Sequence, residues 1–163
     1  MNKVDVLIVG GGLAGLSVAR NIVKNNLTIL IVNKPPAKNN NPARLTFKDT
    51  IDHYGLTDCA LAEYNSFGIF SYHGAVSTHT FSEPTFIALD DKRACEMIFN
   101  ELKAFGNFSY QEGIVTDLVI NDEQALATMN NGEQISTEIV VDASGKNHFS
   151  LKTLNKTIPN LYS

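Results

Sequence analysis

The sequence V-D-V-L-I-V-G-G-G-L-A-G-L, residues 4–16, decides the fold of this chain. Its apolar run, 6–9, predicts a strand buried on both faces, and this run stops at three glycines. Gly10, Gly12 and Gly15 have the spacing G-x-G-x-x-G. The first glycine allows a tight turn, the second lets a pyrophosphate approach the backbone, and the third lets a helix pack against the strand. The stretch therefore predicts a strand, a turn and a helix whose N-terminus binds a phosphate.

The residues that follow have the pattern that a nucleotide-binding fold requires. A helix is predicted over roughly 13–24, and a second apolar strand over 28–32. The second strand ends at Asn33, 18 residues beyond Gly15. A dinucleotide fold places the side chain that holds the adenosine ribose about 20 residues beyond the glycines, and this side chain is usually Asp or Glu. The pattern favours an α/β fold, Rossmann-like, with a central parallel sheet.

Composition and charge restrict the class of protein. The chain has 163 residues, of which 44% are hydrophobic and 18% are charged, as expected for one globular domain. A net charge of −4 argues against nucleic acid as a partner, and no apolar run reaches the length of a transmembrane segment. Cys59 and Cys95 form no C-x-x-C motif. We therefore expect a cytoplasmic protein with reduced thiols that acts on a small-molecule substrate.

The middle of the chain changes from helical to strand-like patterning. Thr46 predicts the N-cap of a short helix over about 47–54, with Gly55 at its C-terminal end. Aromatic and β-branched residues then predict antiparallel strands in an insertion over about 67–89. The insertion is the segment in which we expect the surface that faces the substrate.

The last part of the chain predicts one helix and several strands. Asp90 or Asp91 is expected to cap a helix that runs to about Ala104. Asn130-Asn131-Gly132 predicts a type I′ hairpin turn. The tail, 151–163, shows little pattern. Strands are expected at 108–111, 114–120, 124–129 and 134–141.

Together these features resemble the FAD-binding fold of the glutathione-reductase type. Within it the chain looks most like the flavoproteins related to geranylgeranyl reductase and lycopene cyclase. The motif at 4–16 is similar to the first motif of the FAD-binding members, and Thr137 to Gly145 is similar to their T-x-x-x-x-x-A-(S/T)-G signature. The resemblance implies an FAD/NAD(P)-binding domain over 1–150, with FAD as the cofactor. It implies the FAD-binding part of a flavin-dependent oxidoreductase, with an isoprenoid or another lipophilic molecule as substrate.

The resemblance also implies which residues hold the cofactor. The glycine loop would surround the pyrophosphate, and the end of the second strand would face the adenosine ribose. An arginine would reach the cofactor from the following loop, a meander strand would offer its backbone to the adenine, and the A-S-G motif would pass close by. The residues in these positions are Gly10, Gly12, Leu13, Ala14, Gly15, Asn33, Lys34, Arg44, Val115, Ala143, Ser144 and Gly145.

Two departures from the family pattern leave alternatives open. Asn33 stands where a carboxylate is usual, so an NADP-type ligand beside Lys34 remains an alternative to FAD. Family members also continue beyond the A-S-G strand. The chain could therefore lack a C-terminal half, act with a partner chain, or bind a nucleotide without catalysis. An S-adenosylmethionine site in a methyltransferase fits the pattern through Ala19 less well.

No catalytic or metal-binding residue can be assigned from the sequence. His73 and His79 can share one face of a strand, but no third ligand has a suitable spacing. His53 and Cys59 show no obvious acid that would orient the histidine as a base, so a surface histidine and a buried thiol are the simpler interpretation. We therefore expect no metal, and redox chemistry that the flavin supplies.

Overall fold

In the computed structural model the chain forms two compact units. One comprises Met1–Lys38 and Ile98–Ser163, and the other comprises Asn39–Met97. The expected tail at 151–163 lies outside the described residues. The structure describes residues 2–35, 44–74, 76–121, 124–145 and 149–150.

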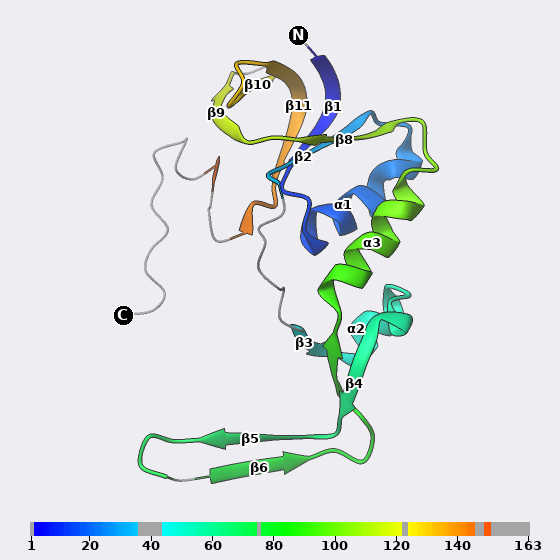
Figure 1. Cartoon of the computed structure of the whole chain (residues 1–163), viewed down its shortest axis with the longest axis vertical. Helices are drawn as coiled ribbons and strands as arrows, with labels where there is room; N and C mark the ends of the chain where they lie inside the picture. The colour runs from blue at the N-terminus through cyan, green and yellow to red at the C-terminus, as the bar shows by residue number, and fades with distance from the viewer. Residues whose placement is uncertain (1, 36–43, 75, 122–123, 146–148, 151–163) are drawn as a thin grey trace. The chain divides into compact units, whose positions relative to one another are not determined.

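A six-stranded mixed sheet organises the first unit (Figure 1). Four neighbouring strands, β8, β2, β1 and β11, run parallel to one another, and β10 and β9 continue the sheet in antiparallel pairing. The parallel half confirms the predicted α/β class. In sheet order the strands are β8 (Phe108–Glu112), β2 (Ile29–Asn33), β1 (Asn2–Val9), β11 (Gln134–Asp142), β10 (Ala125–Met129) and β9 (Val115–Ile120).

The two strands that the apolar runs predicted lie at the centre of the core of this unit. The side chains of 6–9 in β1 and 29–32 in β2 are all buried, which requires packing on both faces of the sheet. Burial of one such aliphatic side chain contributes about 1.5–3 kcal/mol. These central strands therefore support the turn at residues 10–12, called the glycine turn below, which follows the carboxyl end of β1.

The helix α1 (Leu13–Ile22) follows the glycine turn directly. It ends two residues before the predicted Lys24, because a 3₁₀ turn, η1 (Val23–Asn25), replaces its last turn and leads to Asn26 with φ +57°. The guanidinium of Arg20 on α1 forms an ion pair of 2.7 Å with Glu101.

The sequence predicted either Asp90 or Asp91 as the N-cap of the helix α3 (Asp91–Leu102). The Asp90 carboxylate accepts the backbone N–H of Arg93 at 3.0 Å, so Asp90 is the cap. The helix ends at Leu102, where Phe105 donates its N–H to the Leu102 carbonyl, and not at Ala104 as predicted.

The turn between β10 and β11 is not the predicted type I′ turn. Such a turn needs positive φ at both central residues, but Gly132 alone has it, at +83°, and Asn131 does not. The N–H of Gly132 bonds to the Met129 carbonyl at 2.9 Å, and the N–H of Met129 bonds to the Glu133 carbonyl at 2.8 Å. This is the pattern of a three-residue loop, a type I turn followed by a left-handed glycine.

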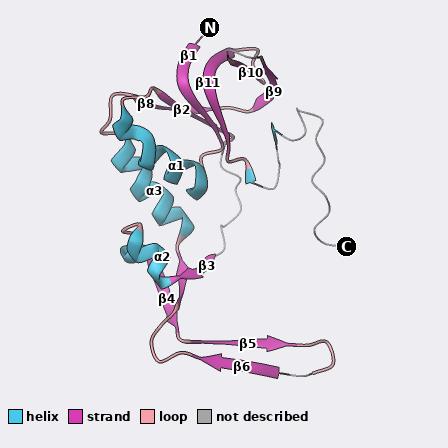
Figure 2. Cartoon of the chain, turned by 180° about the vertical axis from the view of Figure 1, so that it is seen from behind, coloured by secondary structure: helices cyan, strands magenta, loops and turns pink. Residues whose placement is uncertain are grey.

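The second unit contains a three-stranded sheet and a separate hairpin. β7 lies between β3 and β4 and pairs antiparallel with both, while β5 and β6 pair only with each other. The antiparallel strands predicted after residue 67 are confirmed, but β3 and β4 were not predicted. The elements are β3 (Arg44–Phe47), α2 (Lys48–His53), η2 (Thr57–Cys59), β4 (Ala60–Tyr64), β5 (Ser66–Phe70), β6 (Val76–Thr80) and β7 (Phe86–Leu89) (Figure 2).

The predicted N-cap at Thr46 is wrong. Thr46 lies within β3 opposite Ile87, and Phe47 occupies the N-cap position without any side-chain hydrogen bond. Pairing with β7 holds residue 46 in a strand, so its hydroxyl does not cap the helix. Gly55 has φ +63° directly after α2, as a helix-ending glycine should.

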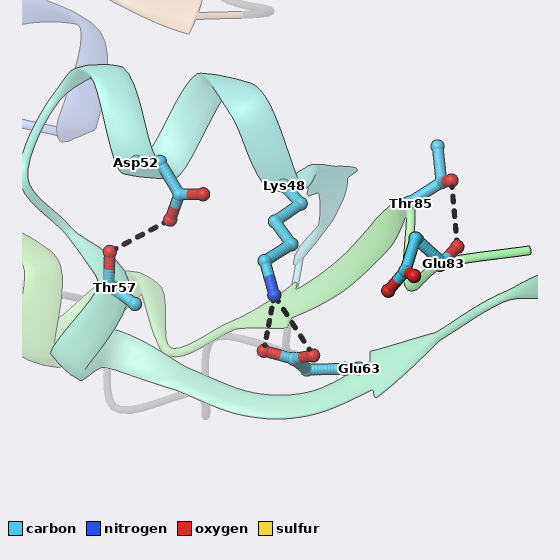
Figure 3. A network of polar contacts seen from close by, with 6 residues as sticks. All are labelled: Lys48, Asp52, Thr57, Glu63, Glu83 and Thr85. Carbon is cyan, nitrogen blue, oxygen red and sulfur yellow. Dashed lines mark hydrogen bonds and ion pairs between the residues drawn. The ribbon is translucent and has the colours of Figure 1, made fainter.

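Polar contacts join the short elements of the second unit (Figure 3). The Lys48 ammonium group at the start of α2 lies 3.2 Å from both carboxylate oxygens of Glu63 on β4. The Thr57 hydroxyl donates to the Asp52 carboxylate at 2.9 Å, and the Thr85 hydroxyl donates to the Glu83 carbonyl at 3.2 Å. The contact between Lys48 and Glu63 fixes α2 to the edge strand β4, and the bond between Thr57 and Asp52 joins η2 to α2.

Within the described residues, no helix has both the length and the apolar character needed to cross a membrane.

Candidate nucleotide site

The glycine turn is fixed by backbone hydrogen bonds to strands on either side of β1. Gly10, with φ +114°, donates its N–H to the Val32 carbonyl on β2 at 2.8 Å. On the other side, Ala143 donates its N–H to the Val9 carbonyl at 2.9 Å. The first glycine motif and the A-S-G motif therefore meet at the carboxyl ends of neighbouring parallel strands, where open α/β sheets bind their ligands.

The three motif glycines have different surroundings. A β-carbon on Gly10 would overlap the Ala143 carbonyl, and one on Gly15 would overlap the Gly10 carbonyl. Both glycines are therefore required by backbone packing, which confirms the reason given for Gly15. A β-carbon on Gly12, in contrast, would meet no atom within 4 Å. The protein itself does not require glycine there, so the open space beside Gly12 is suited to a ligand.

The N-terminus of α1 faces this space without a cap. Gly12 is the N-cap residue, no side chain accepts a hydrogen bond there, and the first turn contains no acidic residue. The first N–H groups of a helix lack partners within the helix and carry partial positive charge. Leu13, Ala14 and Gly15 supply these groups. The site thus combines room beside Gly12 with donors for an anion, which fits the pyrophosphate of a dinucleotide.

The A-S-G motif is held by the carboxylate that precedes it. Asp142 accepts the N–H of Ser144 at 3.0 Å, the N–H of Ser150 at 2.8 Å and the hydroxyl of Ser150 at 2.7 Å. Burial raises the pKa of Asp142, but hydrogen bonds from Ser144 and Ser150 outweigh it and lower the pKa to about 2. Gly145 then turns with φ +68°. The ionised carboxylate therefore fixes the backbone of Ala143 and Ser144 beside the glycine turn.

The predicted ribose residue lies against the glycine turn together with a tyrosine that the sequence did not indicate. Asn33 ends β2, and its side-chain N–H donates to the Tyr110 hydroxyl on β8 at 2.9 Å. A β-carbon on Gly11 would come within 2.9 Å of both Asn33 Cβ and Tyr110 Cε2. Gly11 and Tyr110 thus belong to the site as well. Recognition of 108–112 as a third parallel strand beside β2 would have indicated Tyr110.

The remaining predicted residues have other surroundings. Lys34 follows Asn33 and is exposed. Val115 is buried in the core cluster around β9 and β10, which leaves only its backbone for a ligand contact. Arg44 belongs to the second unit, where its guanidinium forms an ion pair with the buried Asp91 carboxylate at 2.9 Å. The structure therefore brings the glycine turn, Asn33 and the A-S-G motif together at the carboxyl ends of the parallel strands, and the cofactor-binding roles of all the predicted residues stay predictions.

The thiols do not have the surroundings of reactive cysteines. Burial raises the pKa of Cys95 to about 11 and also raises the pKa of Cys59. Within the described ranges of the chain, no cluster of three His, Cys, Asp or Glu side chains could hold a metal ion.

The fold and the glycine turn are typical of dinucleotide-binding α/β proteins, and a comparison of sequences identifies the family. The chain belongs to the lycopene cyclase protein family, whose model matches residues 5–158. This result confirms the resemblance predicted from the two glycine motifs. No curated protein sequence matches the chain.

Solved structures with the same fold include two monooxygenases and a reductase-like protein, at low sequence identity. p-Nitrophenol 4-monooxygenase PnpA from Pseudomonas putida DLL-E4 has a TM-score of 0.78 and 17% identity over 98% of this chain. The flavin-dependent monooxygenase PieE, solved in complex with FAD and substrate, has a TM-score of 0.72 and 16% identity over 94% of this chain. A geranylgeranyl bacteriochlorophyll reductase-like protein from Thermoplasma acidophilum has a TM-score of 0.69 and 16% identity over 88% of this chain.

This chain corresponds to less than half of each of these proteins. The matched part is 45% of PnpA, 32% of PieE and 39% of the reductase-like protein.

Proposed function

We propose that this chain is the FAD-binding portion of a flavin-dependent oxidoreductase. The observation that carries the proposal is the open space at Gly12 in front of the uncapped N-terminus of α1. Gly10 and Gly15 are packed against backbone, so among the three motif glycines Gly12 alone is kept small without a reason inside the protein. Membership of the lycopene cyclase family and the complex of PieE with FAD support FAD as the dinucleotide.

Different residues of the first unit would bind different parts of the cofactor. The N–H groups of Leu13, Ala14 and Gly15 would bind the pyrophosphate, and the side chain of Asn33 would hold the adenosine ribose. A neutral amide in place of a carboxylate weakens such a contact by about 1–2 kcal/mol, because hydrogen bonds to charged groups are the stronger ones. Lys34, exposed beside Asn33, supplies a positive charge at the same end of the site.

The flavin would supply the redox chemistry, and this chain would bind and orient it. Asp142 contributes by fixing the A-S-G backbone next to the pyrophosphate position. No side chain of the chain is assigned as an acid, a base or a nucleophile. The substrate class that we propose, an isoprenoid or another lipophilic molecule, is supported by the family and by the reductase-like structure.

A further polypeptide would complete the enzyme, either as a C-terminal half or as a partner chain. The chain matches less than half of the length of each of the three solved proteins named above. The second unit also exposes large apolar side chains that an additional domain could cover: Leu45, Phe47, Leu61, Ile69, Phe70 and Val76. Without that polypeptide the chain would bind the dinucleotide but would not catalyse a reaction.

A second candidate ligand is NADP(H), favoured by the missing carboxylate at Asn33 and by Lys34 beside it. Absorption spectroscopy of the purified chain tests the two. A flavin spectrum after incubation with FAD and gel filtration supports the proposal. A colourless protein whose melting temperature rises with NADPH, and does not rise with FAD, would replace it with the NADP(H) alternative.

A further inference from the structure

The hairpin formed by β5 and β6 is a two-stranded ribbon with two free edges (Figure 1). Within the described residues, β5 and β6 pair only with each other, through five consecutive pairs without a register shift, and every residue of both strands is exposed. A ribbon of two strands is at best marginally stable by itself in water. The hairpin therefore lacks the additional strands or layers that usually stabilise such a pair.

The edges of this hairpin carry none of the features that normally prevent the addition of a strand. Residues 64–82 contain no Asp, Glu, Lys, Arg or Pro, and the ladder contains no bulge. Natural sheets protect their free edges with charged side chains, proline or bulges. The edge strand β4 has such protection, with Glu63 and a register shift between Ala60 and Ala62. The edges of the hairpin are thus open to a further strand.

The backbone pattern shows which groups a further strand would bond. The Phe81 N–H donates to the Asn65 carbonyl at 2.7 Å at the base of the hairpin. Bonded and non-bonded pairs alternate along an antiparallel ladder, so the pair Phe67–His79, two residues along, is also bonded within the hairpin. The intervening residues direct their N–H and C=O groups outward, away from the paired strand: Ser66, Gly68 and Phe70 on β5, and Val76, Thr78 and Thr80 on β6.

The far end of the hairpin is apolar on both of its faces. Ile69 and Phe70 are neighbours on β5 and therefore point to opposite faces, and they are 61% and 75% exposed. Val76, opposite Phe70, is 57% exposed. At the base, in contrast, the ring of Phe67 packs against Phe86 of β7, with ring centroids 5.6 Å apart. The base of the hairpin is thus anchored within the second unit, whereas both faces of its far end are exposed.

These features favour a β-strand over the other occupants of an apolar surface. A helix bonds its own backbone groups, and a lipid layer has no hydrogen-bond partners for the outward N–H and C=O groups. A lipid surface is also disfavoured because residues 64–82 contain no Lys or Arg to bind anionic headgroups. An added strand pairs the outward groups and extends the sheet, so that both faces can be packed by further layers.

We propose that the hairpin of β5 and β6 is a strand-addition site, at which an extended segment of the further polypeptide hydrogen-bonds along an outer edge of the hairpin. This inference rests on the proposed function for the existence of that polypeptide. The three solved proteins named above favour it over a second copy of this chain, because each is more than twice as long as the part that matches. The added strand should carry apolar side chains on both faces, to pack beside Phe70 and Val76 on one face and Ile69 on the other.

Proline substitutions at outward positions test the site. Thr78→Pro and Ser66→Pro each remove one outward N–H and leave the bonds within the hairpin intact, since proline is tolerated on edge strands. Thr78→Val and Ser66→Ala are the matched controls, because they change the side chain and keep the N–H. The variants are introduced into the gene in its native cells. Native mass spectrometry and thermal unfolding are then applied to the complete protein, which means this chain with any polypeptide attached or bound to it, and to the 163-residue chain alone.

We expect the complete protein to be larger than this chain, and at least one proline to lower its melting temperature by at least about 2 °C, the effect of one lost hydrogen bond. Both controls, and the 163-residue chain with either proline, should melt as their unsubstituted forms do. Amide hydrogen exchange, followed by NMR, gives a second readout. In the complete protein the outward amides of β5 or β6 should exchange at least about 10-fold more slowly than in the chain alone.

Three results would overturn the strand-addition site. The first is a complete protein that contains this chain alone or two copies of it. The second is a complete protein whose melting temperature neither proline changes. The third is equal exchange of the outward amides in the complete protein and in the chain alone, and this comparison decides the question if a proline also destabilises the chain by itself.

FAD binding is measured separately, on the 163-residue chain. The hairpin variants should leave it unchanged, because the proposed dinucleotide site lies in the first unit. Absence of FAD binding by the unsubstituted chain would overturn the proposed function, whereas the melting and exchange results would still decide whether a strand adds to the hairpin.

Discussion

Substitution of Gly12 by valine separates ligand binding from folding at the glycine turn. A β-carbon at Gly12 meets no protein atom within 4 Å, and the backbone there is extended, with φ −79° and ψ −174°. The fold can therefore accept the larger side chain. The cost to the protein is limited to the N-cap preference of α1, about 1 kcal/mol between glycine and an aliphatic residue.

The same substitution should abolish the proposed phosphate site. The valine methyl groups would occupy the space through which the pyrophosphate approaches the N–H groups of Leu13 and Ala14. We expect FAD affinity to fall at least 100-fold, which corresponds to about 2.8 kcal/mol at 1.4 kcal/mol per tenfold change. Fluorescence titration of FAD measures the affinity, and circular dichroism measures the melting temperature.

Two further glycines give the matched controls for this experiment. Gly106→Val makes the same chemical change at another open position, and it should leave FAD binding intact. Gly15→Ala should destabilise the fold, because its β-carbon would overlap the Gly10 carbonyl. Retention of normal FAD affinity by a folded Gly12→Val variant would show that no phosphate binds in this space, and the reasoning would be wrong.

Three other substitutions test separate parts of the structure. Asn33→Glu should tighten FAD binding by up to about 10-fold in calorimetry, because it restores a charged acceptor for the ribose; an unchanged affinity would place the ribose elsewhere. Gly132→Val should lower the free energy of unfolding by about 1–2 kcal/mol in urea titrations, because φ is +83° there, with no effect on FAD binding; an unchanged unfolding midpoint would argue against this turn. Asp142→Asn should destabilise the chain at pH 7. Because the folded pKa of Asp142, about 2, is below its unfolded value, the stabilisation is present above about pH 4 and is lost as the pH falls toward 2. The difference in unfolding midpoint between the variant and the unchanged chain should therefore narrow in acid, and a constant difference would contradict the role of the carboxylate.

The strands and the glycine turn of the first unit were predictable because each rests on a local pattern. The runs at 6–9 and 29–32 are apolar throughout, which only strands buried on both faces require. The glycine spacing likewise carries its own geometric reason, and the space around Gly12 and Gly15 agrees with it.

What could not be predicted depends on pairing between distant segments. Thr46 has a good capping pattern, yet it pairs with Ile87 in a strand, 41 residues away in the sequence. Tyr110 has no motif around it, and it reaches the site only because β8 pairs with β2. The sequence predicted a hairpin turn at Gly132. The type of this turn depends on the backbone angles of Asn131, which the dipeptide Asn131-Gly132 does not determine by itself.

The bond between Val9 and Ala143 has a consequence for synthesis of the protein on the ribosome. β1 emerges first, but its neighbour β11 is separated from it by more than a hundred residues. The hydrogen bond that Ala143 donates to the Val9 carbonyl, next to the turn, forms only after that later segment has been translated. Under the proposed function, the dinucleotide would therefore bind only after β11 has paired with β1.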